Sequence, residues 1–274
     1  MTALLGLATR LKTARLLLVT DARAATGDLA AFAEEAFAGG VDILQLADPA
    51  LDETASLGAL TTLRSVALRR QRIVAVTSDA DLAGEFGADM LVLLDDASSA
   101  DRARRRLHRY ALIGRSCRGT ADIDAALADP DVDFLIVTAT PAAVRHAAAA
   151  APQGDPEAKP WFAAGGLTAA DVGELAAAGC RRVAVSRAIT RAADPRAAAA
   201  ALADALDRAW ADDPAMERVR FAAFRSGRLA GAGTRGSGEE DLAAPDAGDG
   251  FGSLTNPFKG VAPPPATAPR LPEA

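Results

Sequence analysis

Short apolar runs alternate with longer segments of helical periodicity along most of the chain. Eight such runs occur, at residues 15–20, 41–46, 72–77, 90–94, 111–113, 133–138, 160–164 and 182–185. They lack the alternation of apolar and polar residues that marks a strand exposed on one face. The runs are therefore typical of parallel strands that are buried on both faces.

The segments between the runs predict amphipathic helices. The clearest of them places apolar residues at i, i+3, i+4, i+7 and i+8, namely Leu29, Phe32, Ala33, Ala36 and Phe37. We expect Asp28 to cap this helix and Gly39-Gly40 to end it in a left-handed turn. Thr168 and Asp171 predict a capping box at the start of a later helix, and Gly179 its end.

Eight strand–helix units in about 200 residues predict an α/β fold, a TIM (β/α)8 barrel. The alternative is a doubly wound sheet of eight parallel strands. The first run is not followed by a GxGxxG motif, which disfavours a dinucleotide-binding sheet. In a TIM barrel, functional side chains lie where the strands end and the following loops begin.

Composition sets the expected limits of the folded domain. Residues 212–274 contain nine of the 23 glycines and eight of the 15 prolines, a bias typical of disorder. We therefore expect an N-terminal extension over 1–14, the barrel over 15–211 and a disordered tail over 212–274. Within the tail, residues 216–229 could form a nascent helix. The aromatic segment 251–258 could be a docking peptide or an idle stretch, and its partner stays unknown.

Charge and composition exclude several classes of function. The formal net charge is −6, aromatic residues make up 4% of the chain, and no run of eighteen apolar residues occurs. Nucleic-acid and membrane partners are therefore not expected. Without a basic region ahead of the apolar start, a secretory signal is not expected either, and we predict a cytoplasmic protein. Two cysteines and two histidines, without a ligand motif, give no His/Cys metal site, and the cysteines should remain thiols.

The residues after the last two strands favour a phosphate site. Gly165 and Gly166 allow backbone N–H groups to approach an anion without a Cβ between them. Ser186 and the amides that follow it could donate further hydrogen bonds, and Arg187 adds a positive charge. Loops after strands 7 and 8 are the usual phosphate site of a TIM barrel. The alternative is that Gly165-Gly166 forms only a tight turn between strand and helix.

Other polar residues near the strand ends carry weaker indications. Asp79 and the pair Asp95-Asp96 could hold Mg²⁺, but a helix cap and a solvated loop are the favoured alternatives. Cys117, beside Ser116, should line the mouth of the barrel, with no histidine near it in sequence to activate a nucleophile. His108 and His146 are expected on the outer helices after strands 4 and 6.

Six motifs together resemble thiamine phosphate synthase, above all its actinobacterial form. They are ARLLLVTDAR (14–23), GGVDILQL (39–46), GAD (87–89), LIGRS (112–116), KPWFAAGGL (159–167) and RRVAVSRAIT (181–190), with ADP (193–195) after the last. The resemblance spans residues 15–210. It implies a TIM barrel that joins an aminopyrimidine pyrophosphate to a thiazole phosphate with Mg²⁺ and releases pyrophosphate. The thiazole tautomerases are a sister branch with the same barrel.

The sequence departs from the family where charge would surround the leaving pyrophosphate. The family's Gln-Leu-Arg-Glu/Asp-Lys appears here as Gln45-Leu-Ala-Asp-Pro49, and its Asn-Asp as Thr77-Ser78. A second Mg²⁺ carboxylate falls on Ala97 unless a one-residue slip recruits Asp96. The lysine-bearing loop after strand 6 is replaced by Thr140-Pro141. Mg²⁺ would therefore be needed only if the family reaction is retained.

The barrel scaffold and the residues of the expected phosphate site still match the family. The expected binding residues are Gln45, Ser116, Gly165, Gly166, Ser186 and Arg187. Because lost electrostatic contacts cost about 10²–10³ in rate each, we expect a barrel that binds a phosphorylated thiazole or a related phosphate ester, with doubtful catalysis. Two hypotheses stay open. One is a working synthase in which Arg115, Arg118 and Asp95-Asp96 supply the charge. The other is a non-catalytic paralogue that binds a phosphate ligand or acts as a regulatory protein. Self-association through outer helices is left open.

Overall fold

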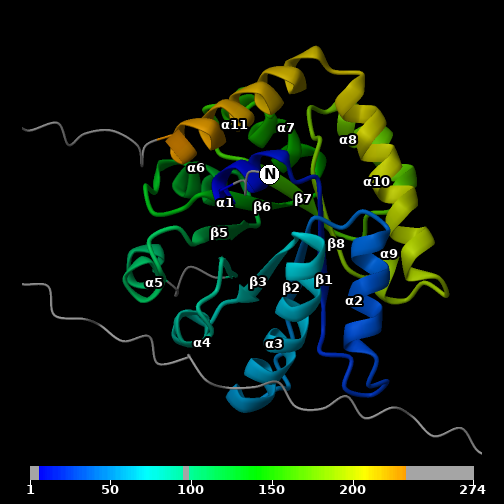
Figure 1. Cartoon of the computed structure of the whole chain (residues 1–274). Coiled ribbons are helices and arrows are strands. Elements are labelled where there is room, and N and C mark those ends of the chain that lie inside the picture. Colours follow the sequence, from blue (N-terminus) through cyan, green and yellow to red (C-terminus); the bar gives the residue numbers. More distant parts are fainter. Residues whose placement is uncertain (1–5, 95–98, 233–274) are drawn as a thin grey trace, which may run out of the picture. The chain divides into compact units, whose positions relative to one another are not determined.

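A computed structural model describes residues 6–94 and 99–232, with backbone alone for 226–232. Eight parallel strands close into a barrel in sequence order, β1 pairing with β8 through Leu17 and Ala184 (Figure 1). The strands are β1 Leu16–Thr20, β2 Ile43–Leu46, β3 Ile73–Thr77, β4 Met90–Leu93, β5 Leu112–Cys117, β6 Phe134–Thr138, β7 Trp161–Ala164 and β8 Val183–Val185. The predicted TIM barrel is confirmed, and closure excludes the open doubly wound sheet.

Helices surround the strands and connect each one to the next. They are α2 Leu29–Ala38, α3 Glu53–Arg70, α4 Ala80–Phe86, α5 Ala100–Arg106, α6 Thr120–Ala128, α7 Pro141–Ala150, α8 Val172–Ala177, α9 Arg187–Thr190 and α10 Pro195–Ala211. Their apolar faces pack on the outward-facing strand residues in one continuous buried cluster. Both faces of every strand are therefore covered, which is why the apolar runs show no alternation.

Two of the expected helix caps differ in their details. Asp28 stands at the N-cap of α2 but makes no capping hydrogen bond, because its carboxylate binds Arg23 instead. Gly40 follows the helix with φ +105°, the expected left-handed turn. The Thr168/Asp171 capping box is present, but it opens a 3₁₀ turn over Ala169–Asp171 that leads into α8.

The barrel interior is filled by a separate apolar cluster to which an N-terminal helix contributes. Helix α1 Leu7–Thr13 contributes Leu11 to this cluster, which also contains the strand residues Leu17 and Phe162. The wholly buried Arg182 at the start of β8 donates from Nε to Ala14 O (3.1 Å) and from Nη2 to Lys12 O (2.8 Å). Burial lowers the pKa of Arg182 to about 10. Residues 6–14 thus close the amino-terminal end of the barrel.

A C-terminal helix, α11 Pro214–Ala232, lies over α1 (Figure 1). Thr9 Oγ1 donates to Ala223 O (3.2 Å), and Met216 and Val219 are buried with Trp210. The predicted helix over 216–229 is therefore present. Helices α1 and α11 both lie outside the expected barrel range 15–211, and disorder does not begin at 212. Residues 233–274, with the aromatic segment 251–258, lie outside the described residues.

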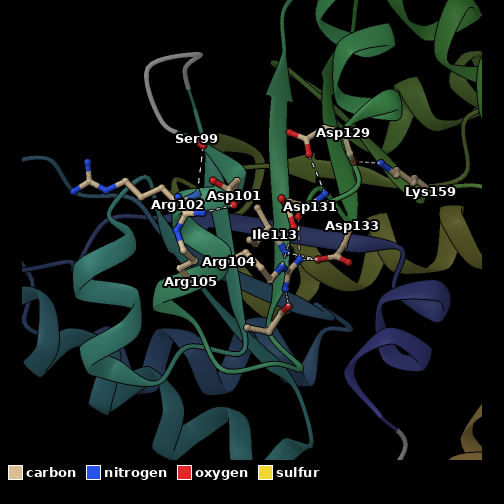
Figure 2. Close-up of polar contacts among 11 residues, drawn as sticks. Ser99, Asp101, Arg102, Arg104, Arg105, Ile113, Asp129, Asp131, Asp133 and Lys159 are labelled. Carbon is tan, nitrogen blue, oxygen red and sulfur yellow. Dashed lines mark hydrogen bonds and ion pairs between the residues drawn. The ribbon is translucent and has the colours of Figure 1, made fainter.

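Helix α5 is fixed to the neighbouring strands by one arginine (Figure 2). Arg104 donates to Ala111 O (2.6 Å), to Asp131 O (2.9 Å) and to the Asp133 carboxylate (2.7 Å). The same Asp133 oxygen accepts from Ile113 N (2.8 Å). These contacts hold the amino ends of β5 and β6 in register.

Within the described part of the chain, no helix is both long and apolar enough to cross a membrane.

Candidate functional site

The mouth of the barrel comprises the carboxyl ends of the eight strands and the residues directly after them. On its β2–β3 side, Gln45 is 2% exposed and points into the barrel. Its Nε2 donates to Thr77 Oγ1 (2.9 Å), and Thr77 Oγ1 donates to Leu46 O (2.6 Å). Gln45 Oε1 is buried without a hydrogen-bond partner among the described residues. A buried acceptor without a partner is costly, so this oxygen can receive a ligand's donor.

On the β7–β8 side, the structure brings Gly166 and Arg187 together. A Cβ built on Gly166 would lie 3.8 Å from Arg187 Nη2, and one on Gly165 would lie 3.5 Å from Ala139 Cβ. Neither glycine has a left-handed φ. Both are exposed, and Ser186 follows β8 beside them at the start of α9. Backbone conformation and packing therefore do not require glycine at either position.

Ser116 lies on the inner face of β5 and Cys117 on its outer face. Ser116 is in register with Ile136, a residue of the interior cluster. Cys117 is wholly buried among the helices, and its one S–H lies within reach of Arg115 O (3.7 Å) and Asp122 O (3.6 Å). The expectation that Cys117 lines the mouth is wrong, because adjacent strand residues face opposite sides. Cys117 and Cys180 are both free thiols, as predicted.

The histidines lie outside the barrel. His146 is on α7, as expected, and its Nε2 lies 2.6 Å from Asp124 Oδ1 of α6. His108 is not on a helix: α5 ends at Arg106, and His108 belongs to the turn that leads to β5. Arg109 and Tyr110 complete that turn.

The carboxylates beside the mouth are engaged in local backbone contacts. Asp79 Oδ1 accepts from Asp81 N (3.0 Å) and Leu82 N (2.9 Å), the helix cap favoured over a metal ligand. Asp48 accepts from Ala22 N and Ala50 N. Within the described ranges no group of three His, Cys, Asp or Glu could hold a metal ion. Asp95, Asp96 and Ala97 lie outside the described residues.

Two cavities near the ends of β2, β3 and β4 were not foreseen from the sequence. One of about 520 Å³ is bordered by polar residues that include Asp81, Ser99 and Arg102, and Figure 2 shows the last two at the start of α5. The other, about 290 Å³, is mostly apolar. Both are bordered by Thr77 and Ser78, and Ser78 has φ +59°. Serine has no marked preference for left-handed φ, so no local sequence pattern indicates this conformation.

Comparison with known proteins identifies the relatives of this barrel. The family model described as thiamine monophosphate synthase matches residues 16–189. The thiamine-phosphate synthase of Saccharopolyspora erythraea is 40% identical over 215 residues, covering 72% of this chain and 95% of that protein. That of Thermobifida fusca is 43% identical over 206 residues, covering 70% and 92%.

Solved structures show the same fold at lower identity. Thiamine phosphate pyrophosphorylase from Pyrococcus furiosus has a TM-score of 0.63 and 20% identity, covering 73% of this chain and 98% of that one. Orotidine 5'-phosphate decarboxylase from Pyrococcus horikoshii has a TM-score of 0.54 and 16% identity, covering 70% and 99%. At such identities the likeness concerns the fold alone.

Proposed function

The chain belongs to the thiamine monophosphate synthase family, and on that premise we propose that its barrel binds a phosphorylated thiazole or a related phosphate ester in thiamine biosynthesis. The observation that carries the proposal is the pairing of Gly166 with Arg187 at the β7–β8 side of the mouth. A Cβ at either glycine would make only an ordinary van der Waals contact, so packing does not require glycine at these positions. A phosphate group there would meet backbone N–H groups and a guanidinium.

The opposite side of the mouth supports a ligand with a hydrogen-bond donor. Gln45 Oε1 is buried and has no partner among the described residues, while its amide nitrogen is held by Thr77. A ring N–H or a hydroxyl reaching this depth would satisfy the acceptor. Ser116, on the inner face of β5, offers a further hydroxyl. The proposed ligand therefore has a phosphate at one end and a small polar group at the other.

We further propose that this barrel binds without transferring a pyrophosphate. Where the family has Arg, Lys, Asn and Asp, this chain has Ala47, Pro49, Thr77 and Ser78, none of which is charged. A departing pyrophosphate needs fixed positive charge, and one lost contact of this kind costs about 10²–10³ in rate. The carboxylates of Asp48 and Asp79 beside the mouth already accept backbone N–H groups. The chain then acts as a binding or regulatory paralogue.

The competing proposal is a working synthase. It is favoured by the 40–43% identity with two curated synthases over more than 90% of their length. It requires that Arg115, Arg118 and the pair Asp95-Asp96 supply the missing charge. Arg118 is exposed at the end of β5, and its backbone N–H donates to Asp122 (2.7 Å).

Two measurements on the full chain separate these proposals. In calorimetric titration, thiazole phosphate should bind equally with and without Mg²⁺, and Arg187→Ala should weaken binding about tenfold or more. Arg191→Ala, an exposed arginine one turn later, is the matched control and should bind normally. In the second measurement, aminopyrimidine pyrophosphate is added with Mg²⁺ and pyrophosphate is followed. Steady release would establish the synthase and refute the binding-only proposal. Absence of binding by the folded protein would refute the phosphate site itself.

A further inference from the structure

The smaller of the two cavities beside β2 and β3, about 290 Å³, lies between the barrel wall and the helices that follow these strands. Leu46 of β2 and Val76 of β3, both outward-facing, border it. Leu60 of α3 and Leu82 of α4 face them from the helix layer. Leu46, Val76 and Leu60 belong to the buried core. Protein interiors are packed as densely as organic crystals, so a space of this size among core side chains is unusual.

This β2–β3 cavity reaches the mouth of the barrel. Its border is completed there by residues at or directly after the ends of β2 and β3, which include Ala47, Pro49, Thr77 and Ser78. Ligands of TIM barrels bind at this end of the strands. A mostly apolar cavity with a few polar groups at its border is the usual form of a small-molecule site. Position and lining therefore both favour a ligand site.

The charges around the β2–β3 cavity indicate what kind of ligand it takes. Among the described residues that border it, Asp48 is the one that carries a charge. Its carboxylate already accepts hydrogen bonds from Ala22 N (3.1 Å) and Ala50 N (3.1 Å). A charged group that leaves water for such a site would lose its hydration without gaining an opposite charge. The group that enters the cavity is therefore uncharged.

The backbone at the edge of the cavity is held in a strained conformation. Ser78 has φ +59°, and Asp79 N donates to Thr77 O (2.7 Å), so these three residues form a γ-turn. A γ-turn with positive φ at its central residue is rare and strained. Strained residues of this kind cluster at ligand-binding sites. This turn sets the positions of Thr77 and Ser78 at the border of the cavity.

We propose that the β2–β3 cavity binds the apolar ring of a small uncharged molecule. An apolar cavity of about 150 Å³ holds one benzene, so the larger β2–β3 cavity accommodates a six-membered ring with a short substituent. Ser56 and Ser78 border the cavity with hydroxyl groups, which can donate to or accept from one polar group on that substituent. The residues expected to bind phosphate do not border the cavity, so this site does not rest on the proposed phosphate site.

Calorimetric titration of the full chain with benzyl alcohol tests the ligand class. Binding should be saturable, with a dissociation constant of about 1 mM. The binding enthalpy should become more negative as the temperature rises, because apolar surface is buried. Benzylammonium has the same ring with a charge on its substituent and should bind at least about tenfold more weakly. Absence of benzyl alcohol binding, or equal or tighter binding of benzylammonium, would overturn the proposal.

A cavity-filling substitution tests the location. Ser56 is buried on the side of α3 that borders the cavity, so the ring of Ser56→Phe should fill it and weaken benzyl alcohol binding about tenfold or more. Ser65→Phe is the matched control, because Ser65 is exposed on the same helix, and it should bind as the wild-type does. Ala47→Phe fills the cavity from the end of β2 and should act as Ser56→Phe does. Wild-type affinity in either filled variant, once shown to be folded, would contradict a site in this cavity.

Competition tests whether the cavity is separate from the phosphate site. Saturating thiazole phosphate should leave the affinity for benzyl alcohol unchanged within about twofold. Loss of benzyl alcohol binding under these conditions would show one shared site and overturn the proposal. If thiazole phosphate does not bind at all, the phosphate site fails, while binding of benzyl alcohol that is lost in Ser56→Phe still establishes the β2–β3 cavity.

Discussion

The side-chain amide of Gln45 on β2 donates to Thr77 Oγ1 on β3 at 2.9 Å, and Thr77 donates to Leu46 O at 2.6 Å. Replacing Thr77 with valine keeps the shape of the side chain and removes both contacts. We expect Thr77→Val to reduce the free energy of unfolding by about 1–3 kcal/mol, because the buried Gln45 amide would then lose its only partner among the described residues and Leu46 O would lose its side-chain donor. Urea denaturation measures this change.

The control is Thr61→Val, whose hydroxyl donates to Leu57 O on an exposed face of α3. This substitution should change stability by no more than about 0.5 kcal/mol. Equal effects of the two valine variants would show that the Gln45–Thr77 pair contributes nothing specific.

A second prediction concerns packing inside the barrel. A Cβ on Gly114 of β5 would overlap the ring of Phe134 on β6, so Gly114→Ala should destabilise the protein by about 1–3 kcal/mol. Gly58→Ala on α3 meets no neighbouring atom and should stabilise it by about 0.5–1 kcal/mol. The two free energies of unfolding should thus change in opposite directions. A neutral Gly114→Ala would contradict the described packing of Phe134.

A third prediction concerns acid stability. The Arg23 guanidinium binds both oxygens of Asp28, at 2.6 and 2.8 Å, and holds the pKa of that carboxyl well below its usual range. Because the pKa is lower in the folded state, the pair stabilises the protein above the ordinary pKa of about 4, and this contribution is lost as the pH falls further. Asp28→Asn should therefore lose less stability than wild type between about pH 5 and pH 3. Parallel pH profiles of the two proteins would contradict this.

A fourth prediction concerns the thiols. Cys117 and Cys180 are 0% and 1% exposed, and burial raises the pKa of Cys180 to about 11. The thiolate that reacts with disulfide reagents is therefore scarce at pH 8. Labelling of the native chain should proceed only as fast as the protein unfolds, and denaturant should release two thiols at once. Rapid labelling of one thiol in the folded protein would show that a cysteine is accessible.

The sequence was sufficient to predict the barrel because strands covered on both faces leave continuous apolar runs. The apolar run of β5 ends at Ile113, but the strand continues to Cys117, since Gly114, Arg115 and Ser116 interrupt the run without ending the strand. Helix α11 was harder to predict, because the spacing of its apolar residues and the composition of its region point to different structures. Its buried residues Met216, Val219 and Ala223 are spaced as in a helix, yet the glycine and proline content of residues 212–274 as a whole indicates disorder.

Side-chain partners were harder to predict than the elements that carry them. The local sequence pattern at Asp28 does not indicate that its carboxylate binds Arg23 and leaves α2 without a capping hydrogen bond. The inward or outward direction of Ser116 and Cys117 depends on strand register, which a short apolar run does not fix. The sequence predicted that Gly166 and Arg187 lie in neighbouring loops after strands 7 and 8. The structure adds that Gly165 and Gly166 both tolerate a Cβ.

That tolerance allows the central claim to be tested with one methyl group. In Gly166→Ala the added carbon lies 3.8 Å from Arg187 Nη2, an ordinary contact, so the midpoint of thermal unfolding without ligand should match wild type. The same carbon would occupy the path of a phosphate to the backbone amides. Calorimetric titration with thiazole phosphate should then show binding weakened by about tenfold or more. Wild-type affinity in a folded Gly166→Ala variant would contradict a phosphate site at this loop.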